Sequence, residues 1–215
     1  MQKTTAAIYN AFKKRMPALQ CCEESIKEAF YILRESFLKG SKLLLCGNGG
    51  SAADCQHIVG ELMKSFILKR PIPPEQRQLL RETFPEESLS DQLQGALPAI
   101  SLISHSSLYS ALLNDVGGDL VFAQQVYGFG KEGDVLLAIS TSGNARNVIL
   151  AAKTARAFGM KTIALTGRSG GGLAALCDIA VKVPADETAA VQEYHQPVYH
   201  ALCAMLEAEF FAAPQ

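Results

Sequence analysis

The chain has 215 residues, of which 48% are hydrophobic and 19% charged, and its formal net charge is −1. This length suits one domain with a sizeable core, and the charge balance gives no electrostatic reason to expect nucleic acid or an anionic membrane as a partner. We find no membrane-spanning apolar run and no signal-peptide pattern at the N-terminus. The six cysteines form no CxxC pair, so we expect free thiols in a cytoplasmic protein.

Helical and strand patterns alternate along most of the chain. The first forty residues carry two helical patterns, and Gly40 is expected to end the second as its C′ residue. The strands are short, continuous apolar runs, which is typical of a parallel sheet covered by helices on both faces. In chain order we predict helices over 3–16 and 20–39, a strand over 42–46, a helix over 51–67, a short helix over 75–82, a strand over 99–103, helices over 105–113 and 119–129, a strand over 134–139, a helix over 144–158, a strand over 161–166, a helix over 170–177, a strand over 178–183 and a last helix over 187–211.

Residues 71–97 differ from their surroundings in composition. Prolines open this segment, a charged and glutamine-rich stretch follows, and Pro98 comes directly after it. We interpret it as a surface insertion in a single domain that covers 1–215, with residues 1–40 as an N-terminal helical extension.

Two turns rich in glycine and hydroxyl side chains each join a predicted strand to a predicted helix. They cover residues 47–51 and 140–144. Backbone N–H groups converge at such a turn, and the helix dipole adds partial positive charge, so the turn can hold a phosphate without a lysine. The carboxyl ends of parallel strands meet at one edge of a sheet, so the two turns together predict a site for a phosphorylated small molecule.

Two predicted helices carry polar side chains that share one face. His57 and Glu61 are spaced i and i+4, and Gln192, Gln196 and His200 are spaced i, i+4 and i+8. Either set could bind a metal ion or act on a substrate. Taken alone, each is also compatible with a solvated polar stripe.

The remaining histidines and one proline allow weaker expectations. His105 is expected to cap or line the helix that follows the strand over 99–103, and His195 is expected to lie on the surface. Pro197 should kink the last helix because it removes the amide that would bond to the carbonyl of Glu193.

Four segments together resemble the sugar isomerase (SIS) domain family, and within it the phosphoheptose isomerases: CGNGGSAADCQHIVGE, AISTSGNARNVI, ALTGRSGG and VQEYHQPVYH, in this order. The resemblance covers about residues 18–208, apart from 71–97. It implies a flavodoxin-like, three-layer αβα sandwich with a five-stranded parallel sheet, and N-terminal helices that form a homotetramer. It also implies interconversion of sedoheptulose 7-phosphate and D-glycero-D-manno-heptose 7-phosphate, a step toward lipopolysaccharide heptose.

The resemblance further implies roles for the residues at matching positions. The implied phosphate contacts are Ser51, Ser140, Thr141 and Ser142. The implied sugar contacts are Asn48, Gly49, Gly50, Asn114, Asp115 and Gln192. The implied ligands of one zinc ion per subunit are His57, Glu61, Gln192 and His200.

The chemistry of the reaction explains these residue types. Converting a ketose to an aldose requires removal of a proton from the carbon beside the carbonyl, formation of an enediol and return of the proton to the neighbouring carbon. We assign Glu61 as the base and His200 as the acid that handles the oxygen protons. A glutamate fully committed to zinc is a poor base, so ligand exchange is needed if Glu61 has both roles.

The chain departs from the family pattern at four positions. Ser65 stands where the family has an arginine, Ala145 where it has a serine, and Ala189 and Ala190 where it has an Asp-Arg pair. These changes leave the exact sugar phosphate and its anomer open.

Two other classes remain as alternatives. One member of the subfamily is not catalytic: it binds the bacterial replication initiator and promotes its assembly at the origin. In that relative the glutamate is lost and the final histidine is not kept, whereas Glu61 and His200 are both present here. A sugar-phosphate-sensing regulator would carry a DNA-binding domain, for which this chain has neither room nor a basic patch.

Overall fold

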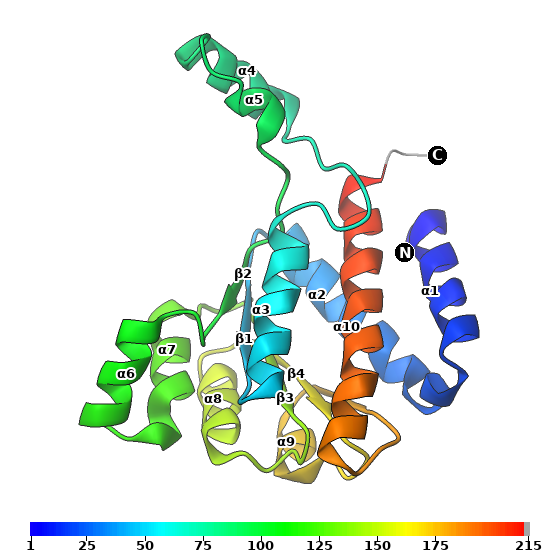
Figure 1. Ribbon diagram of the computed structural model, residues 1–215, viewed down its shortest axis with the longest axis vertical. Helices are drawn as coiled ribbons and strands as arrows, with labels where there is room; N and C mark the ends of the chain where they lie inside the picture. The colour runs from blue at the N-terminus through cyan, green and yellow to red at the C-terminus, as the bar shows by residue number, and fades with distance from the viewer. Residues whose placement is uncertain (213–215) are drawn as a thin grey trace.

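The computed structural model describes residues 1–212 and shows a five-stranded, all-parallel sheet with helices on both faces (Figure 1). The strand order is β2-β1-β3-β4-β5. This arrangement confirms the predicted α/β fold class; residues 213–215 of the predicted domain lie outside the described part. The strands are β1 (Leu43–Cys46), β2 (Ala99–Ser101), β3 (Val135–Ser140), β4 (Lys161–Thr166) and β5 (Ile179–Lys182).

Strand β1 is apolar along its whole length, and β3 is apolar up to Ser140, because both sheet faces are buried there. In β1, Leu43 and Leu45 join the hydrophobic cluster on one face, and Leu44 and Cys46 join the cluster on the other. Successive side chains of a strand point to opposite faces, so each strand serves two cores. This is why the strands are uninterrupted hydrophobic runs rather than alternating patterns.

Each face of the sheet has its own set of helices. The first face is covered by α1 (Lys3–Arg15), α2 (Glu23–Leu38), α3 (Gly50–Met63) and α10 (Thr188–Phe211). The second face is covered by α6 (Ser106–Asp115), α7 (Val121–Phe129), α8 (Arg146–Ala157) and α9 (Gly171–Leu176). The N-terminal helix α1 lies along α10, as Figure 1 shows. No helix within residues 1–212 combines the length and the apolar composition that a membrane span requires.

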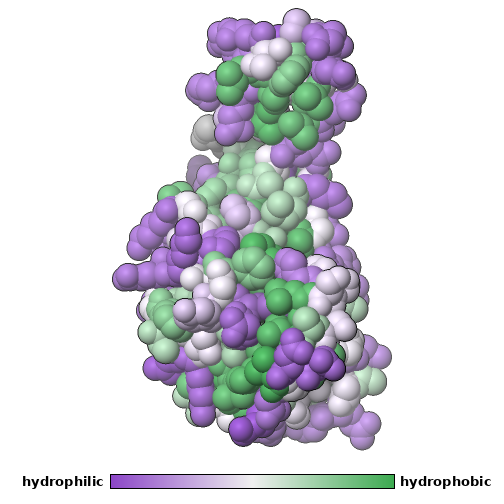
Figure 2. Space-filling model, turned by 90° about the vertical axis from the view of Figure 1, so that its left-hand side faces the viewer, coloured by the Kyte–Doolittle hydropathy of each residue, from purple (hydrophilic) through white to green (hydrophobic). Residues whose placement is uncertain are grey.

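A helical arm projects from the body, and in chain order it lies between α3 and β2 (Figure 1). It consists of α4 (Pro74–Thr83) and α5 (Leu89–Gln92), which pack mainly against each other. No residue of α4 is buried, and Figure 2 shows hydrophobic side chains gathered on the arm. The predicted short helix is confirmed as α4, whereas α5 was not predicted because four residues are too few to show a helical period.

The helix predicted over 51–67 ends at Met63, which is earlier than the sequence pattern indicates. The reason is a tertiary contact with Glu207, a buried residue of α10. Its carboxylate accepts hydrogen bonds of 2.8, 2.8 and 3.0 Å from the backbone N–H groups of Phe66, Ile67 and Leu68. These amides therefore leave the helical pattern, and the chain turns away toward the arm.

Other predicted boundaries differ by a few residues. The helix predicted over 20–39 begins at Glu23 because a 3-10 helix, Pro17–Cys22, precedes it. Gly40 has a φ of 74° and follows α2 as the predicted C′ residue. The last helix, α10, continues through Pro197, and the predicted kink there stays a prediction.

Candidate active site

The two glycine- and hydroxyl-rich turns line one pocket at the carboxyl edge of the sheet. They lie side by side because β1 and β3 are neighbours, with Cys46 paired to Ala138. The cavity has a volume of about 340 Å³. It contains most of the predicted phosphate and sugar contacts: Asn48, Gly49, Gly50, Ser51, Ser140, Thr141, Ser142 and Gln192.

The geometry of this pocket explains two of its residues. A Cβ atom on Gly50 would lie 2.5 Å from Nε2 of Gln192, so a larger residue at position 50 would force the Gln192 side chain to move. The Ser142 hydroxyl accepts a hydrogen bond of 3.2 Å from the Asn144 backbone N–H. Its own proton stays available for a ligand, so the pocket offers neutral donors to an anion.

Asn48 is held by a residue that the sequence analysis did not select. Its side-chain amide donates to Asn147 Oδ1 at 2.9 Å, and the Asn147 amide donates to Asn48 Oδ1 at 3.0 Å. This reciprocal pair joins the first turn to α8. Asn147 carries no spacing signal in the sequence, because its role depends on a contact between two segments far apart in the chain.

Asn114 and Asp115 do not line this pocket. Both are exposed at the end of α6, where the Asn114 amide donates to Asp115 Oδ1 at 2.8 Å. Their predicted contact with the sugar stays a prediction.

His57, Glu61 and His200 come together between α3 and α10. His57 Nε2 lies 3.2 Å from Glu61 Oε1 and 3.4 Å from His200 Nε2. The other Glu61 oxygen lies 3.5 Å from Lys64 Nζ. Burial and the neighbouring His57 lower the pKa of His200, so its imidazole is neutral at neutral pH.

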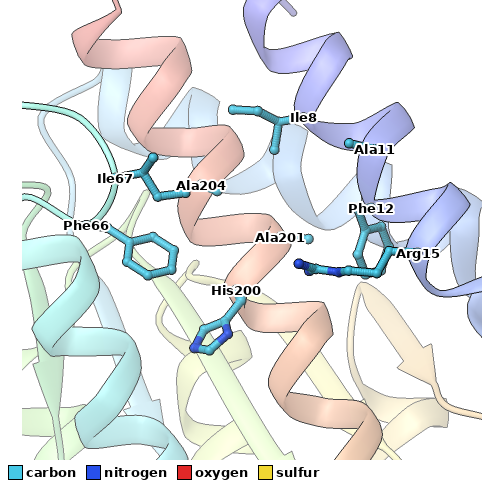
Figure 3. A pocket seen from close by; sticks show the side chains of 9 residues that line it. All are labelled: Ile8, Ala11, Phe12, Arg15, Phe66, Ile67, His200, Ala201 and Ala204. Carbon is cyan, nitrogen blue, oxygen red and sulfur yellow. The ribbon is translucent and has the colours of Figure 1, made fainter.

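An apolar groove adjoins this cluster. Figure 3 shows it between α1, α10 and the segment with Phe66 and Ile67, with His200 at one end and Arg15 on α1 opposite. Its volume is about 290 Å³.

The three clustered side chains have the chemistry of a catalytic zinc site, in which two imidazoles and one carboxylate leave a position for water or substrate. Donor atoms around a tetrahedral zinc ion are about 3.4 Å apart, and the two contacts of His57 come close to this value. Within residues 1–212, however, no group of three or more His, Cys, Asp or Glu side chains is placed so that it could hold a metal ion. The three side chains therefore match a zinc site in residue type and in two contacts, and zinc binding stays a prediction.

Gln192, the fourth predicted ligand, lies elsewhere on α10. It precedes His200 by eight residues, which is about 12 Å along a helix axis. The structure places its amide against Gly50 in the turn pocket. Its role as a zinc ligand stays a prediction.

Comparison with known proteins identifies the architecture. The sequence model of the SIS domain family matches residues 9–94 and 92–167. The chain belongs to the SIS domain family.

Curated relatives of this SIS-domain chain are named phosphoheptose isomerase. The protein from Helicobacter pylori is 39% identical over 210 residues, which cover 98% of this chain and 95% of the relative. The solved phosphoheptose isomerase from Neisseria gonorrhoeae superposes with a TM-score of 0.71 at 34% identity, over 94% of this chain and 98% of that one. The one from Francisella tularensis gives 0.74 at 30% identity, over 95% and 98%. These matches confirm the predicted family and fold.

The SIS-domain site contains two residues that the sequence analysis missed, Asp54 and Tyr199. The Tyr199 hydroxyl lies 3.0 Å from His57 Nδ1 and 3.2 Å from Asp54 Oδ1. Asp54 lies one helical turn before His57, which is a usable signal, whereas Tyr199 reaches the site only through the packing of α10 on α3. Burial raises the pKa of Asp54, and its bond to Tyr199 opposes this shift.

The expectation that His195 lies on the surface is wrong. Its side chain is fully buried, and neither ring nitrogen finds a hydrogen-bond partner among the described residues. Burial lowers its pKa to about 4. His195 follows Val191 by one helical turn on the buried side of α10, so position on the helix outweighs the polarity of the ring.

His105 lies at the start of the helix that follows β2, as one of the two expected alternatives has it. It occupies the N-cap position of α6 but makes no side-chain capping bond. Its ring instead stacks on Phe129, with centroids 5.1 Å apart, and its Nδ1 lies 3.2 Å from Gln125 Oε1. His105 therefore lines the start of the helix.

Proposed function

We propose that this SIS-domain protein is a phosphosugar aldose–ketose isomerase that interconverts sedoheptulose 7-phosphate and D-glycero-D-manno-heptose 7-phosphate. The proposal depends on one observation. The anion pocket, with its uncharged hydrogen-bond donors, lies at the start of α3, and the acid–base cluster lies near the end of the same helix. Ser51 lies in the first turn of this helix, and Glu61 lies about 15 Å further along its axis. That separation suits a long sugar phosphate better than a triose.

The two helices that build the site support this layout. Near the start of α3, Gly50 lies against the Gln192 side chain of α10. About two helical turns later, His57 contacts Tyr199 and His200 of α10. Because α3 and α10 keep the same register at both contacts, we propose that the sugar extends from the anion pocket toward the cluster. A sugar chain bound there has its phosphate at the turns and its carbonyl end at Glu61.

In this arrangement each residue has a chemical task. The hydroxyls of Ser51, Ser140, Thr141 and Ser142, with the N–H groups of both turns, bind the phosphate. Glu61 removes the proton from the carbon beside the carbonyl and returns it to the neighbouring carbon. His200, whose lowered pKa keeps the ring neutral, exchanges protons with the two substrate oxygens.

His57, Glu61 and His200 would hold a zinc ion, with Gln192 as the proposed fourth ligand. When bound, zinc supplies Lewis-acid polarisation of the substrate oxygens. The donor set supports this assignment: both imidazoles lie within 3.4 Å of each other, and the carboxylate lies 3.2 Å from His57.

We also propose that the protein is a cytoplasmic homotetramer and that residues 1–40 form part of the contact between subunits. Exposed apolar side chains on α2, Tyr31 and Leu38, support such a contact. Asn114 and Asp115 are exposed and lie outside the pocket of their own chain, which leaves them free to face a neighbouring subunit. The six free thiols support a reducing compartment.

The alternative of a non-catalytic protein that binds the replication initiator is not favoured. Glu61 and His200, which that relative lacks, are present here and belong to one cluster around His57.

A turnover experiment tests the proposal. Zinc-loaded protein is incubated with sedoheptulose 7-phosphate, and the aldose product is followed by NMR. We expect conversion of the phosphorylated ketose and none of unphosphorylated sedoheptulose, because the anion pocket requires the phosphate. Absence of conversion by folded, zinc-loaded protein would refute the proposed function.

A further inference from the structure

We propose that Asp54 and Tyr199 are positioning residues that fix the ring and the tautomer of His57. This inference rests on the proposed function, because it concerns how His57 meets Glu61 and His200. Neither Asp54 nor Tyr199 belongs to the predicted site. Tyr199 contacts the ring nitrogen of His57 that faces away from the cluster, and Asp54 contacts the Tyr199 hydroxyl.

The contacts form a chain across two helices. Tyr199 on α10 is buried, and its hydroxyl lies between His57 Nδ1 at 3.0 Å and Asp54 Oδ1 at 3.2 Å, both on α3. The Tyr199 ring also meets the His57 ring edge-on, with centroids 5.5 Å apart and planes at 72°. His57 is thus held on one side by a hydroxyl and an aromatic ring, and its Nε2 faces Glu61 and His200.

The number of available protons decides which group donates in the Tyr199–Asp54 and Tyr199–His57 hydrogen bonds. A phenol has one proton to donate, and an ionised carboxylate only accepts. The second oxygen of Asp54 is buried with no partner among the described residues, so Tyr199 is the one side chain found to donate to this carboxylate. Diverting that proton to His57 would leave a buried carboxylate without a donor, which is costly.

The Tyr199 hydroxyl therefore donates to Asp54 and accepts from His57, which places the imidazole proton on Nδ1. The lone pair of Nε2 then points to the cluster. Unlike Asp54, Glu61 does not depend on one hydrogen bond, because its carboxylate is partly exposed and one of its oxygens lies 3.5 Å from Lys64 Nζ. A histidine that binds a metal through Nε2 requires this tautomer. Mutating the residues that hydrogen-bond to the other ring nitrogen of such a histidine usually lowers metal affinity or activity by 10–100-fold.

The test compares Tyr199→Phe and Asp54→Asn with Tyr9→Phe. The control removes a hydroxyl that is also buried and also hydrogen-bonded, at 2.9 Å to the Glu23 carbonyl, but on α1 and away from the cluster. Thermal unfolding shows whether each variant folds. The first readout is the tautomer of His57 in metal-free protein at pH 8, from long-range proton–nitrogen NMR of histidine-labelled protein with the signal assigned by His57→Gln.

We expect the Nδ1–H form of His57 in the parent and in Tyr9→Phe, and loss of that preference in Tyr199→Phe. The second readout is zinc affinity by competition with a chelator. It should fall by about 10–100-fold in Tyr199→Phe, fall less in Asp54→Asn and stay unchanged in Tyr9→Phe.

A parent protein with the His57 proton on Nε2 would overturn the inference, as would a folded Tyr199→Phe variant with parental zinc affinity. Failure of the proposed function looks different: the parent would not convert sedoheptulose 7-phosphate, while its tautomer and its response to Tyr199→Phe stayed as expected. If the parent binds no zinc, the zinc assignment is refuted. The NMR measurement of the His57 tautomer then tests by itself whether Asp54 and Tyr199 position His57.

Discussion

The Nε2 atoms of His57 and His200 lie 3.4 Å apart, although 143 residues separate them in the chain. The contact exists because α10, the last helix, packs beside α3, which follows the first strand (Figure 1). A site built between two such helices depends on tertiary packing for its geometry and on local spacing for its residue types.

Replacing His200 by Gln should reduce isomerisation by about 10²–10⁴-fold, because an amide cannot exchange protons as a neutral imidazole does. Gln196→Ala, an exposed change on the same helix, serves as the control and should keep full activity. Initial rates with sedoheptulose 7-phosphate measure both. Equal rates for the two variants would remove His200 from the mechanism.

Ser142→Ala should mainly raise KM. The hydroxyl accepts only one local bond, from the Asn144 N–H, and its proton is free to donate to a phosphate. Loss of one hydrogen bond to a charged group costs roughly 1.5–3 kcal/mol. If the hydroxyl serves only to shape the turn, the variant would instead lower the melting temperature and leave KM unchanged.

Arg70→Met should destabilise the fold by about 3–5 kcal/mol, since it leaves the buried carboxylate of Glu207 without its cation. The Arg70 side chain is buried and donates to Glu207 at 2.7 Å and to the carbonyls of Leu62 and Glu61 at 2.8 Å. Urea unfolding measures the loss. Lys69→Met, an exposed change next to it, should have little effect.

The double variant Arg70→Met with Glu207→Gln removes both charges and should recover part of that stability. No recovery would show that the arginine acts through its packing and its bonds to the two carbonyls rather than by neutralising Glu207.

His195→Leu should remove a pH dependence of stability. The pKa of His195 is about 4 in the folded protein against 6.5 as the ordinary value, so between these values the unfolded chain binds a proton that the folded chain does not. The free energy of unfolding therefore falls as the pH drops from 6.5 to 4, by roughly 3 kcal/mol. Urea unfolding at both pH values should show a smaller fall in the variant; identical falls would contradict the assignment.

Removal of the arm should leave the body folded. The segments at its base lie side by side, with Pro71 and Gln94 forming an antiparallel bridge, so residues 73–93 can be replaced by a short glycine turn. The melting temperature should change little because the arm packs mainly on itself. A large drop would show that the arm is an integral part of the core rather than an insertion.

The fold followed from the sequence because each strand serves two buried faces and each main helix has an apolar period. Predicted helix ends were wrong where a side chain far away in the sequence accepts hydrogen bonds from backbone N–H groups, as Glu207 does after the end of α3. The buried position of His195 was missed because polarity was given more weight than place on the helix. Asp54 had a helical spacing to His57, but Tyr199 and Asn147 reach their partners only through packing, which no local pattern reports.

In the proposed reaction, Glu61 moves a proton between two carbons of a heptose phosphate. Conversion of sedoheptulose 7-phosphate in deuterium oxide tests it most directly, with zinc-loaded parent and Glu61→Gln compared side by side. We expect the parent to form the aldose with deuterium at the carbon beside the carbonyl, because the proton on Glu61 exchanges with solvent. The folded variant should form no aldose. Parental turnover and deuterium incorporation by Glu61→Gln would contradict it.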